Sequence, residues 1–362
     1  MLKNNTKNNI NDKFFSTSLI NWYKKNKRDL PWRKNVTSKD YVYRVLISEF
    51  MLQQTTVSTV IPYFNKFIKK WPSIKKLSKA NLDEVLLSWQ GLGYYTRAKN
   101  LLKTSNFVCN QYNAIVPSSL KKLKELPGIG DYSAAAIRSI GYNKKAVAVD
   151  GNVKRVIARY YGLKGTSKNN SEIINQIASR ICPDRSNRVY TQAIMELGAI
   201  ICKPRKYNCK KCCLKKNCLS YKQNIVHLIP SKKIKLHKEK LNCISFLILD
   251  QHKSVLMKKR KDTKLLANQW ELPSTNWVKK PPKFSKICTP FPKSNWKNTN
   301  FRLKHIFSHL ELENAVYISE KKIGEVSKNF KDSEWIDNCN IKKIVVTTMT
   351  KKILKKFNLV QT

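Results

Sequence analysis

The chain has 362 residues, of which 41% are hydrophobic and 10% are aromatic. This composition excludes a disordered polymer and allows two domains with separate cores. Lysine and arginine total 71 against 23 aspartate and glutamate residues, so the formal charge is +48 and a polyanion such as nucleic acid is the expected partner. Biased codon usage is an alternative source for part of the charge, because the lysines are spread along the whole chain.

The first residues, 1–13, are polar and rich in asparagine, and they lack the apolar stretch of a signal peptide. No run of eighteen apolar residues follows, so we expect no membrane span. These features predict a soluble intracellular protein with a short disordered start over 1–13.

Residues 14–226 have a helical pattern, because apolar side chains recur every three or four positions. A lysine-rich stretch over 227–240 is polar enough to be an interdomain linker. Beyond it the pattern changes, which predicts a smaller α/β domain over 241–362. Its expected strands and closing helix cover 241–249, 254–257, 301–312, 315–319 and 342–357.

Glu49 is the first candidate site residue along the chain, in the segment V-L-I-S-E-F-M-L-Q-Q-T. Large apolar residues flank it, and such surroundings raise the pKa of a carboxyl group and favour a proton-donating acid. The alternative is a glutamate on the wet edge of a helix, paired with one of the many lysines.

A short hairpin between two helical segments is predicted at Leu126–Ala134, which reads L-P-G-I-G-D-Y-S-A. Gly128 and Gly130 would let the turn expose backbone N–H groups, and the next helix presents its positive end, so a phosphate could bind there. A plain helix-capping turn is the alternative.

Asp150 follows the apolar run A-V-A-V and precedes Gly-Asn and an amphipathic segment. This pattern is typical of a helix N-cap. A carboxylate at the mouth of a cleft is the functional interpretation, and N-capping does not exclude it.

Four cysteines, Cys202, Cys209, Cys212 and Cys218, lie within a lysine-rich run with the spacing C-x6-C-x2-C-x5-C. Four thiolates can complete the coordination of an iron-sulfur cluster or a zinc ion. Zinc sites usually have two C-x2-4-C pairs, and only one is present here, so the spacing favours a 4Fe-4S cluster. Cys213 could replace Cys212 as a ligand.

The order of these elements (S-E-x-M-L-Q-Q-T, G-L-G-Y-Y-x-R-A, L-P-G-I-G-x-Y, V-D-G-N-V-K-R and the cysteines) closely resembles the adenine DNA glycosylases of the helix-hairpin-helix, endonuclease III superfamily. The family removes adenine mispaired with 8-oxoguanine. The resemblance implies an all-α helix-hairpin-helix domain with one 4Fe-4S cluster, followed by a Nudix-like α/β domain. It also implies a cytoplasmic, nucleoid-associated monomer.

By this resemblance, Glu49 matches the acid that protonates adenine, and Asp150 matches the carboxylate that stabilises the oxocarbenium-like sugar. Tyr132 matches a tyrosine between these two, where endonuclease III relatives have a lysine nucleophile. Little intrinsic strand cleavage is therefore expected. Asn152 matches a residue that supports Asp150 and the attacking water.

The resemblance also assigns DNA contacts. Gln54 and Tyr94 match side chains that wedge into the base stack opposite the extruded adenine, with ordinary packing as the alternative. Trp32 and Arg33 match the edge of the adenine pocket. The basic loop around the cysteines, which includes Lys203 and Arg205, is expected to bind phosphates.

In the C-terminal domain, Phe307, Ser308 and His309 match a tip that reads the lesion. Oxidation turns guanine N7 into an N–H donor, and the Ser308 hydroxyl or the main chain could accept from it. A buried strand turn is the alternative. The domain lacks a Nudix metal box, so nucleotide hydrolysis is not expected.

Two other functions compete with adenine excision from A:8-oxoguanine or A:G mismatches in double-stranded DNA. An endonuclease III type enzyme for oxidised pyrimidines is disfavoured by Tyr132 in place of lysine and by the extra domain. A non-catalytic iron-sulfur DNA-binding regulator is disfavoured because an inert binder has no chemical need for Glu49 and Asp150.

Overall fold

The structure is a computed structural model that describes residues 12–231, 238–261, 265–319 and 326–360. The chain divides into two compact units. Unit 1 comprises Met1–Ala80 and Thr96–Ile234, and unit 2 comprises Asn81–Tyr95 and Lys235–Thr362. Residues 81–95 thus belong to the same unit as the C-terminal part of the chain. The predicted domain boundary at 227–240 placed them with the N-terminal domain instead. Most of the predicted disordered start (1–11) and the middle of the predicted linker (232–237) lie outside the described residues.

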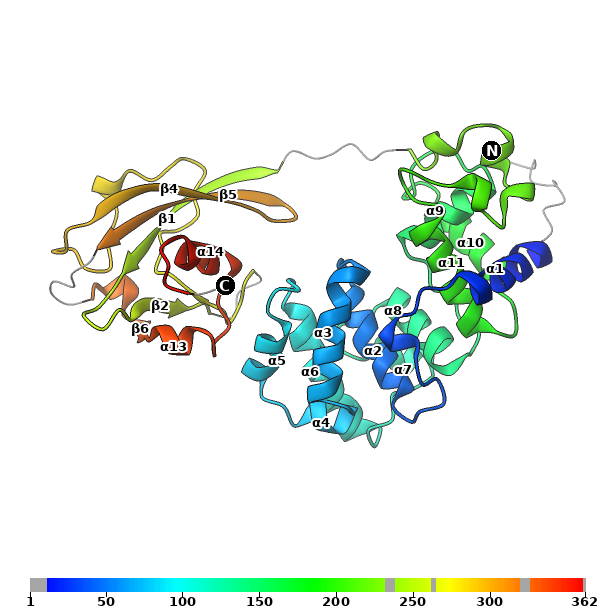
Figure 1. The fold of residues 1–362 in the computed structure, drawn as a ribbon, viewed down its shortest axis with the longest axis horizontal. Coiled ribbons are helices and arrows are strands. Elements are labelled where there is room, and N and C mark those ends of the chain that lie inside the picture. The colour runs from blue at the N-terminus through cyan, green and yellow to red at the C-terminus, as the bar shows by residue number, and fades with distance from the viewer. Residues whose placement is uncertain (1–11, 232–237, 262–264, 320–325, 361–362) are drawn as a thin grey trace. The chain divides into compact units, whose positions relative to one another are not determined.

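Unit 1 is built from helices joined by short turns, as Figure 1 shows. Its α-helices are α1 (Asp12–Asn26), α2 (Tyr41–Leu52), α3 (Val57–Lys70), α4 (Ile74–Ser78), α6 (Thr96–Gln111), α7 (Leu120–Lys124), α8 (Asp131–Ala136), α9 (Gly151–Tyr160), α10 (Ser171–Ile181), α11 (Asn187–Ile200) and α12 (Leu219–Lys222). Its shorter turns are η1 (Pro31–Arg33), η2 (Ile137–Gly141), η3 (Cys209–Lys211), η4 (Lys215–Asn217) and η5 (Val226–Leu228).

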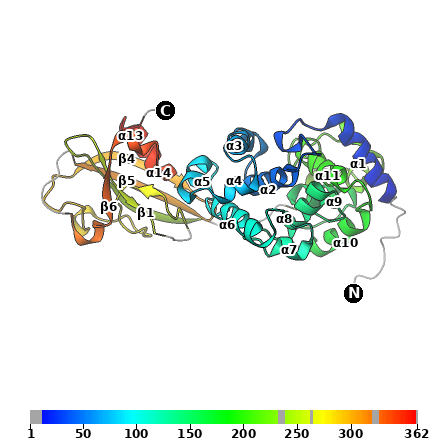
Figure 2. The same cartoon turned by 90° about the horizontal axis from the view of Figure 1, so that it is seen from below.

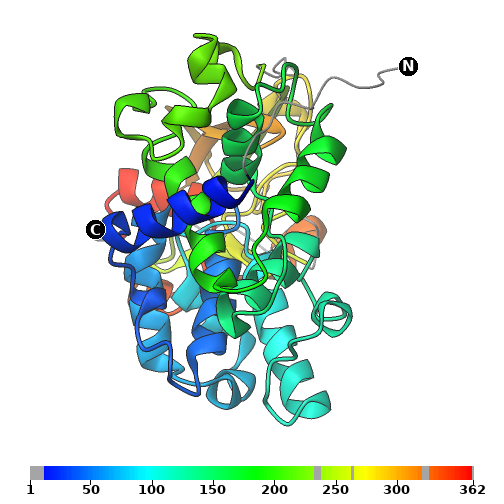
Figure 3. The ribbon, with the colours of Figure 1, turned by 90° about the vertical axis from the view of Figure 1, so that its right-hand side faces the viewer.

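The apolar spacing in these helices explains how unit 1 packs. In α1, Phe15, Leu19 and Tyr23 recur at four-residue intervals, and all three are buried against α10 and α11 (Figure 3). The same core takes up Val156 and Tyr160 from α9. Helix α2 is buried on nearly every side, which gives Glu49 its apolar surroundings.

The predicted hairpin lies between α7 and α8. Gly128 has φ +81°, and a Cβ atom there would lie 2.8 Å from Asn100 Cβ and 3.0 Å from a ring carbon of Phe50. Only glycine fits this conformation and this close approach. Gly130 is the N-cap of α8 in extended backbone, with open space where a side chain would lie.

Unit 2 contains two small sheets and the helix α5 (Leu82–Trp89). Strand β1 (Glu239–Ile248) pairs in parallel with β5 (Leu310–Ser319), which pairs antiparallel with β4 (Lys297–Ile306). The second sheet joins β3 (Trp270–Glu271), β2 (Val255–Lys259) and β6 (Ser333–Ile336). The remaining elements are η6 (Phe284–Lys286), η7 (Lys328–Phe330), α13 (Asn338–Ile341) and α14 (Thr348–Lys356). Helix α14 lies beside the first sheet (Figure 2), and Ile353 shares a core with Leu303 and Leu312.

Two expectations for unit 2 differ from the structure. The predicted strand over 301–312 is interrupted at 307–309, where β4 turns into β5. The predicted helix over 342–357 begins only at Thr348, because backbone bonds tie the preceding residues to β3: Trp270 N donates to Val345 O at 2.7 Å and Thr347 N donates to Trp270 O at 2.8 Å. Thr347 then caps α14.

Candidate active site

Glu49 is buried in α2, with only 6% of its surface exposed. Burial raises the pKa of its carboxyl to about 7, and the nearby Asp150 carboxylate acts in the same direction, while a hydrogen bond with Tyr132 opposes the shift. A carboxyl group with this pKa still carries its proton near neutral pH in a large fraction of molecules. It can therefore donate a proton.

The hairpin positions Tyr132 against this acid. Tyr132 is in the first turn of α8, packs against the small core formed by α2 and α8, and hydrogen-bonds to Glu49. Its pKa lies well above the usual range because of burial and of the two neighbouring carboxylates. The phenol therefore stays neutral and is a donor to the Glu49 carboxylate.

Asp150 is the N-cap of α9, as its sequence pattern predicts. Its Oδ1 accepts from Val153 N at 2.7 Å, and its Oδ2 accepts from Asn152 Nδ2 at 2.8 Å. These bonds hold the half-buried carboxylate at the positive end of the helix.

A chain of hydrogen bonds continues from Asp150 toward the cysteine loop. Asn152 Oδ1 accepts from Arg155 Nη2 at 2.8 Å, and Arg155 Nε donates to the Cys202 carbonyl at 2.7 Å. Gly198 permits this packing of α11 on α9, because a Cβ atom there would lie 2.6 Å from Asn152 Cβ. The orientation of Asn152 thus depends on the loop that begins at Cys202.

One cavity of about 200 Å³ brings most of the predicted catalytic residues together. Glu49, Tyr132, Asp150 and Asn152 all line it. Trp32 and Arg33 line it as well, in agreement with their expected place at the edge of a base pocket. Gln54, Gly128 and Gly130 do not line this cavity.

Sequence reasoning missed part of the cavity wall. One face of α11 contributes Gln192, Met195 and Glu196, and the loop before η1 contributes Arg28. The available signal was a glutamate inside the apolar run A-I-M-E-L-G-A, because a charged residue among apolar helix positions needs a buried partner. No single pattern in the sequence indicates that Arg28 is that partner.

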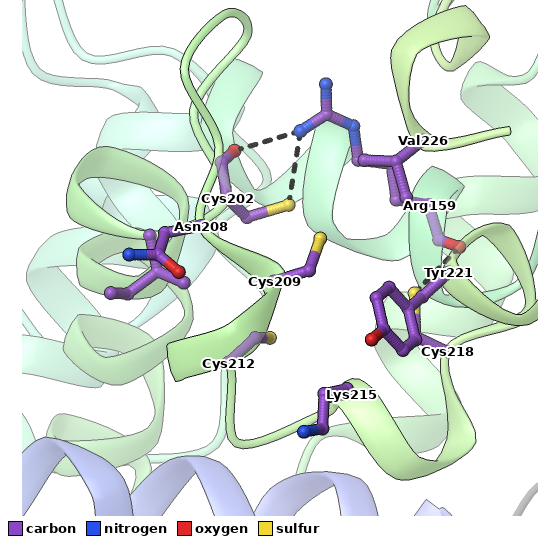
Figure 4. Close-up of a pocket in the computed structure, with 10 residues that line it drawn as sticks. Arg159, Cys202, Asn208, Cys209, Cys212, Lys215, Cys218, Tyr221 and Val226 are labelled. Carbon is purple, nitrogen blue, oxygen red and sulfur yellow. Dashed lines mark hydrogen bonds between the residues drawn. The ribbon is translucent and has the colours of Figure 1, made fainter. Parts of the chain in front are cut away.

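The four predicted cysteine ligands lie around a second cavity (Figure 4). The cavity is lined by Cys202, Cys209, Cys212 and Cys218, and none of these four forms a disulfide. Cys213 is not among the lining residues. No carboxylate or imidazole is present among its lining residues, which are otherwise Arg159, Ile201, Asn208, Lys215, Tyr221 and Val226. Across the residues that the structure describes, no three His, Cys, Asp or Glu side chains gather closely enough to hold one metal ion.

This donor set fits a cluster better than a single ion, because a 4Fe-4S cluster takes one thiolate at each of its four irons and so keeps the four cysteine sulfur atoms apart. Arg159 holds the cysteine loop in place. Its Nη1 lies 3.4 Å from Cys202 Sγ and donates to Lys203 O at 2.7 Å. Its Nε donates to Ile229 O at 2.8 Å. The basic residues of the loop point outward and are exposed, namely Lys203, Arg205, Lys206, Lys210 and Lys211.

Gln54 and Tyr94 share an uncommon backbone conformation. Gln54 follows α2 with φ 56° and is exposed, and Tyr94 follows α5 with φ 48° and is 49% exposed. Left-handed backbone in a residue other than glycine costs about 1–3 kcal/mol and clusters at functional sites. The ordinary-packing alternative therefore does not describe either side chain.

The tip Phe307–His309 is the turn of the β4–β5 hairpin. Phe307 packs against Trp277 and His305, whereas Ser308 and His309 are exposed. Within unit 2, the hydroxyls of Ser308 and Tyr94 are 2.7 Å apart and share a hydrogen bond. Phe307 is partly buried, and the buried-turn alternative does not describe Ser308 or His309.

Comparison with protein-family models gives two matches. Residues 47–183 match the HhH-GPD superfamily base excision DNA repair protein model, and residues 244–356 match the NUDIX domain model. Adenine DNA glycosylase of Buchnera aphidicola from Baizongia pistaciae is 36% identical over 95% of this chain and 97% of its own length. The chain belongs to the adenine DNA glycosylase family.

A more distant adenine DNA glycosylase also aligns with most of this chain. The human protein is 27% identical over 95% of this chain and 74% of its own length. Among solved structures, a thermostable thymine-DNA glycosylase is similar with a TM-score of 0.53 and 32% identity, covering 59% of this chain and 97% of its own. The expected fold class and the expectation of a base-excision repair enzyme are thereby confirmed. No described helix is long and apolar enough to cross a membrane.

Proposed function

We propose that this enzyme excises adenine mispaired with 8-oxoguanine or guanine in double-stranded DNA, as a monomer in the cytoplasm at the nucleoid. The observation that supports the proposal is that one cavity contains two carboxyl groups in different surroundings. Glu49 has a pKa raised to about 7, whereas Asp150 accepts two hydrogen bonds at a helix N-terminus. One acid and one carboxylate are what hydrolysis of an N-glycosidic bond requires.

In this mechanism the extruded adenine enters the cavity and Glu49 transfers its proton to a ring nitrogen of the base. The bond between sugar C1′ and the base then breaks, and its electron pair leaves with the protonated purine. The cation left on the sugar faces the Asp150 carboxylate, which stabilises it electrostatically. Water adds to C1′ and passes a proton to a carboxylate.

Tyr132 and Asn152 position these two groups. Tyr132 hydrogen-bonds to Glu49, and Asn152 donates to Asp150. A tyrosine cannot form the imine with the sugar that a lysine would form, so base removal is expected to leave the strand intact until alkali is added.

The DNA contacts follow from exposed groups in each unit. Gly128 and Gly130 shape the hairpin whose backbone N–H groups would bind phosphate. In unit 1, Gln54 is exposed in a strained conformation, as expected of a wedge that fills the space left by the extruded base. In unit 2, Tyr94 is proposed to do the same, and Ser308 and His309 are proposed to read the edge of 8-oxoguanine.

The proposed cofactor is one 4Fe-4S cluster held by Cys202, Cys209, Cys212 and Cys218. When bound, it would supply a rigid covalent anchor for the basic loop rather than redox chemistry in base removal. The chain's own groups would then contact the DNA backbone through this loop, and the affinity would fall with salt.

Single-turnover cleavage with and without alkali tests the proposal. The substrates are duplexes with adenine opposite 8-oxoguanine, thymine glycol opposite adenine, and thymine opposite guanine. We expect alkali-dependent cleavage at adenine alone. Alkali-independent cleavage at thymine glycol would instead indicate an endonuclease III type enzyme, excision of thymine would indicate the specificity named for the thymine-DNA glycosylase, and binding without cleavage would indicate a regulator.

A further inference from the structure

Glu196 is buried in the wall of the catalytic cavity and binds two guanidinium groups. Its side chain is 1% exposed, and its Oε1 accepts from Arg28 Nε at 2.6 Å and from the Arg28 backbone N at 3.1 Å. Its Oε2 accepts from Arg28 Nη2 at 3.0 Å and from Arg33 Nη2 at 2.8 Å. Burial opposes ionisation, but the bonds from both arginines outweigh it and lower the pKa of Glu196 to about 2.

The same contacts fix Arg33. Its Nη1 donates to the Arg28 carbonyl at 3.1 Å, and its guanidinium lies over the ring of Tyr23 at 5.4 Å from the centroid. Only 14% of the Arg33 side chain is exposed. A buried guanidinium held on three sides cannot move away from the base that enters the cavity.

The arginines form a cationic partition between two cavities. Beside the catalytic cavity lies a third cavity of about 590 Å³. Both of these cavities are lined by Arg28, Arg33 and Gln192. This third cavity is basic. Its lining also includes Lys27, Lys34 and Arg188, whereas Asp29 is the one acidic residue among the lining residues. Without Glu196, the wall that the base contacts would carry two uncompensated positive charges.

Such a charge matters because the proton from Glu49 makes the base positively charged until its bond to the sugar breaks. At the effective dielectric constant of a protein, one unit charge within about 8 Å of a cation changes its protonation equilibrium by more than about tenfold. The carboxylate of Glu196 removes one of the two charges and leaves the other in a fixed orientation.

We propose that Glu196 is a positioning residue that orients Arg33 at the base and neutralises one of the two guanidinium charges, so that protonation of the base is opposed less strongly. The inference rests on the proposed excision of adenine. The competing explanation is that this network only holds α11 against the loop before η1.

The test separates charge from shape with two variants. Glu196→Gln keeps the size of the side chain and one acceptor oxygen, which can take two of the four hydrogen bonds, but it removes the compensating charge. Arg28→Gln together with Glu196→Gln returns the wall to one net positive charge. Single-turnover excision of adenine opposite 8-oxoguanine is measured for both, beside affinity for a duplex that carries a non-hydrolysable 2′-fluoro-adenosine.

We expect Glu196→Gln to lower the excision rate about a hundredfold while duplex affinity changes little. The double variant should excise about tenfold faster than the single variant, although it lacks more hydrogen bonds. Glu271→Gln is the matched control, because Glu271 is a glutamate with only 14% of its side chain exposed that pairs with Arg260 at 2.7 Å in unit 2. This control should lose stability without a comparable loss of excision.

A double variant no faster than Glu196→Gln would overturn the charge-compensating role. If Glu196→Gln does not fold, the excision rates of Arg28→Gln and of the double variant are compared instead. The double variant should excise adenine more slowly than Arg28→Gln. Equal rates would refute the inference. Absence of adenine excision in the unmodified chain would refute the proposed function itself, and so the two failures are distinguishable.

Discussion

At the scale of single residues, the proposed acid Glu49 is expected to determine how the excision rate responds to pH. Its carboxyl must be protonated to act, and burial raises its pKa to about 7. We expect the single-turnover excision rate to fall as pH rises above about 7, approaching about tenfold per pH unit. Glu49→Gln should abolish excision at all pH values while mismatch binding is retained. Excision by the variant at the rate of the unmodified chain would exclude Glu49 as the acid.

The same group makes folding stability depend on pH. The pKa of Glu49 is raised in the folded state relative to its value of 4.5, so the folded chain holds this proton more tightly than the unfolded chain does. Its contribution to the unfolding free energy is present below pH 4.5 and is lost as pH rises to about 7, by about 3 kcal/mol in total. Denaturant unfolding at several pH values should show this loss, and Glu49→Gln should remove it.

Arg155 connects the catalytic carboxylate to the cysteine loop. Arg155→Met would remove the hydrogen bond to Asn152 Oδ1 and the shorter of the two bonds to the Cys202 carbonyl. We expect at least about tenfold slower excision, because Asp150 then loses its orienting partner. Arg180→Met is a suitable control, since Arg180 pairs with Asp12 at the surface of the same unit. Iron content is measured alongside, and a rate that follows iron loss alone would argue against the route through Asn152.

At the scale of elements, the hairpin between α7 and α8 has two glycines that differ in backbone conformation and in the space around them. Gly128→Ala places a Cβ atom within 2.8 Å of Asn100 in left-handed backbone. We expect it to lower the unfolding free energy by about 2 kcal/mol or more and to weaken duplex binding. Gly130→Ala is the control for stability, because nothing lies within 4 Å of its Cβ position. Equal stability of the two variants would contradict this account of the turn.

At the scale of the whole molecule, unit 2 is expected to supply the preference for the damaged partner base. Replacing Ser308 and His309 by Ala removes the exposed side chains of the β4–β5 turn. We expect the preference for 8-oxoguanine over guanine, measured as the ratio of excision rates, to fall about tenfold, as for one lost hydrogen bond to a base edge.

The matched control replaces Gln251 and His252, which are exposed at the β1–β2 turn of the same unit. This variant should keep the ratio, because that turn is not proposed to contact the lesion. An unchanged ratio in the Ser308 and His309 variant would remove the tip from the model of lesion reading.

The sequence by itself determined the elements whose patterns are local. Apolar spacing indicated the helices of unit 1, and residues 126–134 were identified as a hairpin because their proline and paired glycines favour a turn. The Asp150 N-cap and the four cysteines of one loop were also predictable, since each depends on spacing along the chain. Motif order then related the chain to a family.

Only the tertiary structure decided which groups meet across long separations. Glu196 is 168 residues from Arg28, and no local pattern encodes their pairing. The place of Cys212, but not of Cys213, in the lining of the cysteine cavity also depended on contacts from elsewhere, as did the start of α14 only after Val345 and Thr347 bond to Trp270. The physical reason is that burial and partner geometry set the charge state and orientation of a side chain, and both arise only when distant segments pack together.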